Sequence, residues 1–204
     1  MLEKFSQHFH LTDQSVVFED NKHHYKGIPA SLFSFLEMFG GMTFNNGLYR
    51  VHTFRSSIVW SSIISEYFID YQSEIYPFGF DWMGRQFCMS TKDENLIFMF
   101  DPATHEDFEL SQNVISFHDV DLVEDTTNML SDDLFNEALK ANLLTDIKHN
   151  ECLSLNIPMF LGGEDIIENY RKSDLEVYWH IQSQIYKKIK DLPDGTKIGS
   201  IKFE

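Results

Sequence analysis

The spacing of hydrophobic residues predicts two helices in the first third of the chain. The first begins at Pro29, which suits the first position of a helix, and ends before Gly40-Gly41. The second follows Thr53, whose hydroxyl can cap it. Its apolar positions are numerous, and we expect this helix to be buried on more than one face: Ile58, Val59, Trp60, Ile63, Ile64, Tyr67 and Phe68.

Short strands are predicted around and after these helices. Asn46-Gly47 marks a turn before a strand over 48–51. Further strands are expected over 85–90, 95–100 and 107–111. The second of these is almost wholly apolar, as expected for a central strand that is covered on both faces. In the third, Phe108 and Leu110 alternate and should point inward. Because the connecting loops are short, the three strands should form an antiparallel meander.

Two more helices and a closing strand are predicted in the last third. Ser131 can cap a helix that has Asp132 and Asp133 in its first turn. Ser173 and Glu176 fit a capping box for another. The apolar side of this helix comprises Val177, Tyr178, Ile181, Ile185 and Ile189. Residues 197–203 follow as a strand. The order indicates an α+β fold, an antiparallel meander packed with several helices.

The segment 119–133 is rich in carboxylates and is the candidate domain boundary. It divides the chain into residues 1–118 and a smaller helical and β part, residues 119–204. We expect the two parts to pack as one compact unit.

Composition places the chain among folded proteins. Its 204 residues are 43% hydrophobic and 15% aromatic, enough to bury a core. No stretch of the chain reaches the about 20 apolar residues of a membrane span. The N-terminus has no basic segment followed by an apolar one, as a secretion signal would have. We therefore expect a cytoplasmic protein without membrane contact. Cys88 and Cys152 are predicted to be small buried hydrophobes.

The net charge is −16. An acidic chain repels nucleic acid, so this protein should not bind DNA or RNA. Two interpretations stay open: simple solubility, or a surface complementary to a basic partner. The acids proposed for such a surface lie in the boundary segment: Asp119, Asp121, Glu124, Asp125, Asp132 and Asp133.

Residue patterns give little support for catalysis, a cofactor or a metal site. His8 with His10, and His23 with His24, lack a third ligand at useful spacing. Cys88 lies in a predicted core strand, which does not suit a nucleophile. Gly162-Gly163 lacks the Lys of a phosphate loop, and the following Glu164 and Asp165 fit the start of a helix instead. An enzyme that uses Cys88, or His118 with Asp119, remains a minor alternative.

Three stretches together resemble a known family. The first comprises residues 28–32, Phe39-Gly40 and 46–48, and it resembles the start of a GAD-like domain. The second is 78–87, with Asp81, Trp82, Gly84 and Arg85, followed by 100–104. The third and most specific is 151–165, followed by Asn169, Asp174, Tyr178-Trp179, Gln184 and 193–196; it includes Pro158, Gly162, Gly163, Glu164 and Asp165. The combination is similar to immunity proteins of type VI secretion DNase effectors, with a GAD-like N-terminal part and a family-specific C-terminal part.

This resemblance implies a binding protein rather than an enzyme. Its partner would be a toxin, a DNase by analogy, encoded by an adjacent gene and held in a 1:1 or 2:2 complex. Most motif residues are of core and turn types, so we expect them to hold the fold, whereas variable surface residues contact the toxin. The alternative is a small-molecule or nucleotide-binding regulatory module without catalysis.

Overall fold

The computed structural model describes residues 2–14, 28–110, 112–145, 147–193 and 195–198. Their main feature is a seven-stranded antiparallel sheet in which every strand pairs with its neighbour in sequence. The strands are β1 (Leu11–Asp13), β2 (Thr43–Phe44), β3 (Tyr49–Val51), β4 (Ile75–Asp81), β5 (Gln86–Ser90), β6 (Ile97–Asp101) and β7 (Glu106–Leu110). The predicted meander is therefore confirmed, and it extends over all seven strands.

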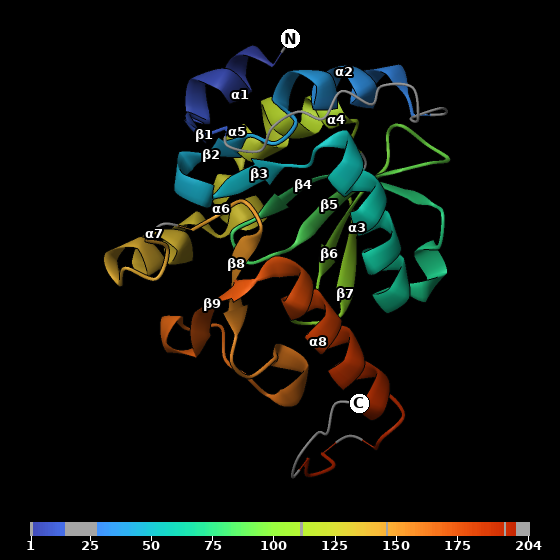
Figure 1. Ribbon diagram of the computed structural model, residues 1–204, viewed down its shortest axis with the longest axis vertical. Coiled ribbons are helices and arrows are strands. Elements are labelled where there is room, and N and C mark those ends of the chain that lie inside the picture. The colour runs from blue at the N-terminus through green and yellow to red at the C-terminus, as the bar shows by residue number, and fades with distance from the viewer. Residues whose placement is uncertain (1, 15–27, 111, 146, 194, 199–204) are drawn as a thin grey trace.

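Helices cover both faces of this sheet (Figure 1). On one face lie α3 (Phe54–Tyr67) and α8 (Leu175–Ile189), side by side. The other face is covered by α1 (Glu3–His8), α2 (Ala30–Phe39) and a chain of short helical pieces. These pieces are α4 (Val114–Ser116), a π-helical turn (Phe117–Asp121), α5 (Leu122–Glu124) and α6 (Thr126–Leu130), after which α7 (Asp132–Lys140) follows. The predicted α+β class is confirmed.

A small second sheet joins the C-terminal part to the main one. It consists of β8 (Glu151–Leu155) paired antiparallel with β9 (Tyr170–Asp174). Leu153 N–H donates to the carbonyl of Trp82 at the end of β4 (2.8 Å). The remaining short pieces are 3-10 helices at Asn45–Gly47, Ile69–Tyr71, Met159–Leu161 and Ile167–Asn169.

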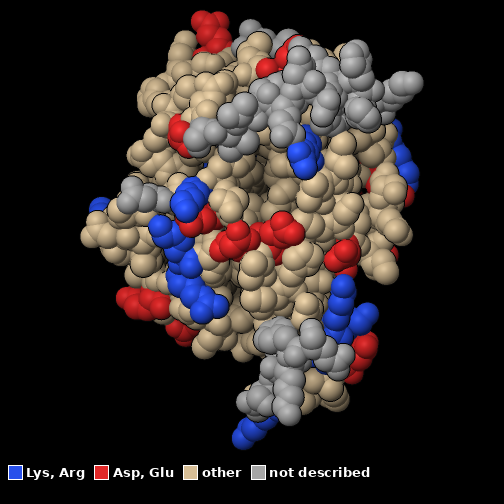
Figure 2. Space-filling model, in the orientation of Figure 1, with Lys and Arg blue, Asp and Glu red and all other residues tan. Residues whose placement is uncertain are grey.

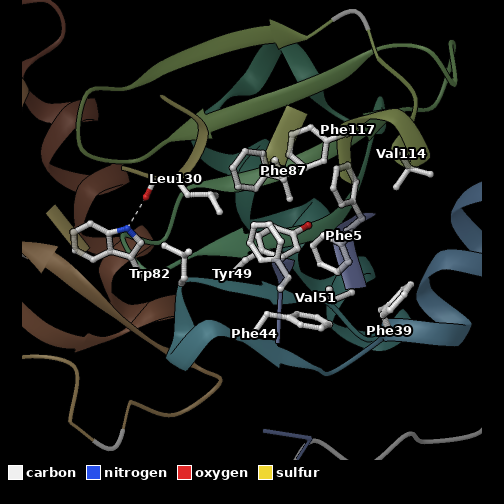
Figure 3. Close-up of a cluster of buried hydrophobic side chains, with 14 of the residues drawn as sticks. Phe5, Phe39, Phe44, Tyr49, Val51, Trp82, Phe87, Val114, Phe117 and Leu130 are labelled. Atoms are coloured by element: carbon white, nitrogen blue, oxygen red, sulfur yellow. Dashed lines mark hydrogen bonds between the residues drawn. The ribbon is translucent and has the colours of Figure 1, made fainter. Parts of the chain in front are cut away.

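Alternation along the central strands creates two cores. On β5, Phe87 and Met89 point to the core under α1 and α2, whereas Cys88 points to the core under α3 and α8. β6 follows the same rule and is covered on both faces, as predicted. The first core holds a set of interlocked rings that includes Phe5, Phe44 and Tyr49 (Figure 3).

The predicted domain boundary lies between residues 118 and 119, within the π-helical turn. Residues from both sides of it, such as Phe117 and Leu122, belong to the same core. The division into two domains stays a prediction, and both parts contribute residues to each of the two cores.

Several helix and turn predictions agree with the structure. The helix after Pro29 ends at Phe39, and Thr53 caps α3 through a capping box with Ser56. Asn46-Gly47 forms the predicted turn, with both residues at positive φ. Both cysteines are buried and free.

Other predictions about helix faces and ends were wrong. In α3, Ile58 and Val59 are 52% and 46% exposed, so this helix is buried on one side only. The last helix is capped by Asp174, whose carboxylate accepts from Val177 N–H, because the helix begins at Leu175 and Ser173 lies one residue before the cap position. Val177 is 53% exposed rather than inward. Ser131 occupies the cap position of α7 at φ 52°, without a side-chain cap hydrogen bond.

Corrections also apply to predicted strands. Phe108 is 44% exposed, because β7 is an edge strand with little cover on either face. Residues 199–203 of the predicted closing strand lie outside the described residues, and 197–198 are not in a strand. His23 and His24 also lie outside the described residues.

Candidate functional site

The acidic segment 119–133 forms a helical ridge beside the N-terminal helix. Asp119 sits in the π-helical turn, and its Oδ1 accepts a hydrogen bond from the Phe5 N–H (2.9 Å). Phe5 lies in the first turn of α1, so this carboxylate satisfies a backbone donor that the helix leaves free. Asp119 therefore stabilises the start of α1, and of the proposed acids it is the least available for contact with a partner.

Three further acids crowd one turn of this ridge. Burial raises the pKa of Asp121, and repulsion from Glu124 and Asp125 adds to the rise. Glu124 forms an exposed ion pair with Lys4 (3.1 Å), and Asp125 accepts from the Asn128 side-chain amide (2.7 Å). The like charges on this turn are thus only partly compensated, which favours the approach of a cation.

A groove runs along the other end of the ridge. Its volume is about 740 Å³, and it is lined by α1, β1 and the Asn45–Gly47 turn on one side and by α6 and α7 on the other. Asp132 lines it, and the Oδ1 atom of Asp132 is buried without a hydrogen-bond partner. Asp133, one residue on, is exposed. The structure thereby joins the acidic segment to a cleft between the N-terminal part of the chain and helices α6 and α7.

Acidic character is concentrated in one stretch of sequence. Residues 93–139 contain no Lys or Arg, although they include β6, β7 and the whole helical ridge. By contrast, the face on which α3 and α8 lie exposes Lys and Arg as well as Asp and Glu (Figure 2). The ridge is therefore a better candidate than that face for contact with a basic partner.

The motif around Trp82 is the link between the main sheet and the C-terminal part. Asp81 is buried, and its carboxylate accepts from Arg85 Nε (2.6 Å) and from the backbone N–H groups of Met83 and Arg85. Arg85 then donates to the Met129 carbonyl (3.0 Å). Trp82 Nε1 donates to the Leu130 carbonyl (2.7 Å), as Figure 3 shows. One tight turn thus fixes the end of the acidic ridge.

Gly84 and Trp179 complete this link on the opposite face of the sheet. Gly84 has φ +84°, and a Cβ there would lie 2.8 Å from Leu175 Cδ1. Trp179 is fully buried in α8 and donates from Nε1 to the Gly84 carbonyl (2.8 Å). The neighbouring Tyr178 is buried in the same core. These contacts are those of residues that hold the fold together.

The 158–165 motif shapes a loop at the end of β8. Gly163 N–H donates to the Pro158 carbonyl (3.0 Å), and a Cβ on Gly163 would overlap the Ile157 carbonyl. Glu164 and Asp165 do not begin a helix, contrary to the prediction, because the next helical turn starts at Ile167. Asp165 instead accepts from the Tyr170 hydroxyl (2.6 Å). Gly162, at φ +84°, has open space around it.

A buried arginine was missed from the sequence. Arg50 of β3 is fully buried and donates to the carbonyls of Lys148, His149, Glu151 and Asp81. Its guanidinium lies 4.9 Å from the centre of the Phe80 ring, and burial lowers its pKa to about 10. Carbonyl dipoles hold this cation, and it ties the entry of β8 to the sheet. The sequence feature that could have predicted this buried cation is an arginine within a short, otherwise apolar strand.

The residues of the minor enzyme alternative do not come together. Cys88 lies in the core under α3 and α8, and burial raises its pKa. His118 lies on the opposite side of the sheet, where its ring contacts Phe5, Phe35 and Phe78. Burial lowers the pKa of His118 to about 3, and Asp119 is turned toward α1. Among the described residues, no three His, Cys, Asp or Glu side chains could hold a metal ion together.

Comparison with known proteins identifies the C-terminal part. Residues 111–186 match the family described as "T6SS immunity protein Tdi1, C-terminal". This segment is similar to a type VI secretion immunity family. The family resemblance predicted from the sequence is confirmed there, and the match spans the acidic ridge, β8, β9 and most of α8.

A solved structure shares the whole fold. The crystal structure of Atu4351 from Agrobacterium tumefaciens superposes with a TM-score of 0.67. The two chains are 18% identical, and the alignment covers 90% of this chain and 89% of that one. At this identity the likeness shows the fold alone. A search of curated proteins gave no match, and no described helix combines the length and apolarity that a membrane crossing requires.

Proposed function

We propose that this protein is the immunity partner of a basic, secreted nuclease toxin, which it neutralises by binding in the cytoplasm. The observation that carries the proposal is the family match over residues 111–186, which includes the whole acidic segment 119–133. The toxin would be delivered by a neighbouring cell, and the gene adjacent to this one would encode it. A DNase must present a basic surface to its polyanionic substrate.

The acidic ridge and the adjoining groove are the proposed contact surface. Asp121, Glu124, Asp125 and Asp133 would face the basic surface of the toxin, either as a mimic of DNA or as a cover over its active site. Asp132 adds an unpartnered buried oxygen that a donor from the toxin can satisfy. Opposite charges at such a surface accelerate association and select the partner.

Measured affinity for the product of the adjacent gene tests this proposal. The toxin is purified as an inactive variant, and binding is followed by calorimetry at two salt concentrations. The variant E124Q/D125N/D133N should bind about tenfold or more weakly, with less dependence on salt. The control E164Q/E168Q/D191N removes as many exposed charges elsewhere and should change affinity less than about threefold.

Three results would count against the proposal. An adjacent product that is not toxic, or that is toxic without affinity for this protein, removes the function itself. Equal losses in the two triple variants would remove the ridge as the contact surface. The alternative, a nucleotide-binding or small-molecule module, predicts instead that nucleotides raise the melting temperature.

A further inference from the structure

The outer edge of β7 is open. Within the described residues β7 is the last strand of the sheet, and it pairs only with β6. In an antiparallel pair, half of the backbone N–H and C=O groups of an edge strand point away from the sheet. These groups can form hydrogen bonds with an added strand.

Side chains on this edge are unusually exposed for a strand. Four of the five residues of β7 are exposed, and Leu110 is half-buried. Phe108 is 44% exposed, although the sheet has two covered faces elsewhere. Phe108 pairs with the partly buried Met99 of β6 and so offers an apolar contact beside the open edge.

The edge also carries three carboxylates in five residues. Asp107 accepts a hydrogen bond from the Tyr71 hydroxyl and shares a cavity of about 260 Å³ with Lys187 and Lys190 of α8. Glu106 and Glu109 do not line that cavity, so these two carboxylates are the ones available to an added strand.

The charge of the edge decides which strand can dock there. A second copy of this chain would place carboxylates beside carboxylates, and like charges on paired strands are destabilising. Lys or Arg side chains on an incoming strand would face Glu106 and Glu109 with opposite charge. The occupant that fits this charge is therefore an extended, cationic segment.

We infer that β7 accepts a basic β-strand of the toxin as an eighth strand of the sheet. Hydrogen bonds to the backbone of β7 supply affinity, Phe108 supplies an apolar contact, and Glu106 and Glu109 select for Lys and Arg. This inference rests on the proposed function, because it takes the basic toxin as the partner. It adds a second contact, separate from the acidic ridge.

Affinity for the inactive toxin encoded by the adjacent gene tests the inference. The variant E106K/E109K should bind about tenfold or more weakly than the wild type. The control E164K/E168K makes the same change of charge on exposed residues of the C-terminal loop, and its affinity should stay within about threefold. Circular dichroism and equal melting temperatures establish that both variants are folded.

Hydrogen exchange on the wild-type complex gives an independent measurement that needs no substitution. Amides of 106–110 should become protected when toxin binds, whereas those of 162–168 should not. Unchanged exchange in β7, or unchanged affinity of E106K/E109K, overturns the inference while leaving the proposed function standing. The inference is also overturned if E106Q/E109Q dimerises and still binds toxin with wild-type affinity. That result would mean that Glu106 and Glu109 only prevent two copies of this protein from pairing through β7. A wild-type protein that does not bind the toxin overturns both.

Discussion

At the scale of single residues, the turn at 81–85 carries the strongest structural demands. Asp81 and Arg85 form a buried ion pair. Removing one partner leaves an uncompensated buried charge, which destabilises a protein more than replacing both partners by hydrophobic residues. The same turn contacts Met129 and Leu130, so it couples the main sheet to the family segment.

Replacing Arg85 by Met tests this pair. The substitution leaves Asp81 buried without its partner, and the free energy of unfolding should fall by about 3–5 kcal/mol. Urea denaturation measures the loss. Lys92→Met breaks an exposed pair with Glu74 and should cost less than about 1 kcal/mol. Similar costs for both variants would show that the buried pair contributes no more than the surface pair.

Gly84 and Gly162 provide a matched comparison, because both have φ +84°. Gly162→Ala meets nothing within 4 Å and should cost about 1–2 kcal/mol for the left-handed backbone alone. Gly84→Ala also meets Leu175 and should cost about 1–3 kcal/mol more. Thermal denaturation of the two variants measures the difference. Equal losses would mean that Leu175 moves aside freely.

At the scale of elements, sequence patterns predicted which residues form helices and strands better than they predicted which side chains are exposed. The helices at Ala30–Phe39 and Phe54–Tyr67 and the central strands follow from periodicity and caps. The exposure of Val59, Phe108 and Val177 did not follow, because it depends on where the sheet ends and which helix covers it. The sequence predicts Ser173 as the cap because the polar pattern of 170–174 does not indicate the strand β9.

Thr53 and Ser131 both stand at predicted helix caps, but only Thr53 forms a side-chain cap hydrogen bond, so the two can be tested as a pair. Thr53 accepts from Ser56 N–H (3.1 Å), so Thr53→Ala should cost about 1 kcal/mol of stability. Ser131 stands at the cap of α7 but makes no side-chain cap hydrogen bond, so Ser131→Ala should change stability by less than about 0.5 kcal/mol. Chemical denaturation compares them. A larger loss at Ser131 would contradict the assigned caps.

At the scale of the whole molecule, the candidate site was predictable in part. The acids of 119–133 were identified from their density alone. That Asp119 supports α1, and that Asp132 lines a groove completed by β1, required the fold. Arg50 was missed because a local pattern does not reveal four carbonyls that converge from distant segments.

Buried histidines link stability to pH. Burial lowers the pKa of His52 to about 3, whereas an unfolded histidine titrates near 6.5. As the pH falls below about 6.5, the unfolded state binds a proton that the folded state refuses, so stability decreases. Between pH 7 and pH 5 His52 should cost about 2 kcal/mol. His52→Gln should remove that loss, as measured by urea denaturation at both pH values. An unchanged pH dependence would show that His52 does not remain neutral in the folded protein.

Under the proposed function this protein is a stoichiometric inhibitor of its toxin. The most direct test titrates it into the active product of the adjacent gene and follows the cleavage of DNA. We predict that the rate of DNA cleavage falls linearly and reaches zero at one copy of this protein for each copy of toxin. The mass of the toxin should stay the same, because inhibition is by binding alone. Cleavage that persists at tenfold excess, or inactivation of many toxin molecules by one copy of this protein, would contradict the account.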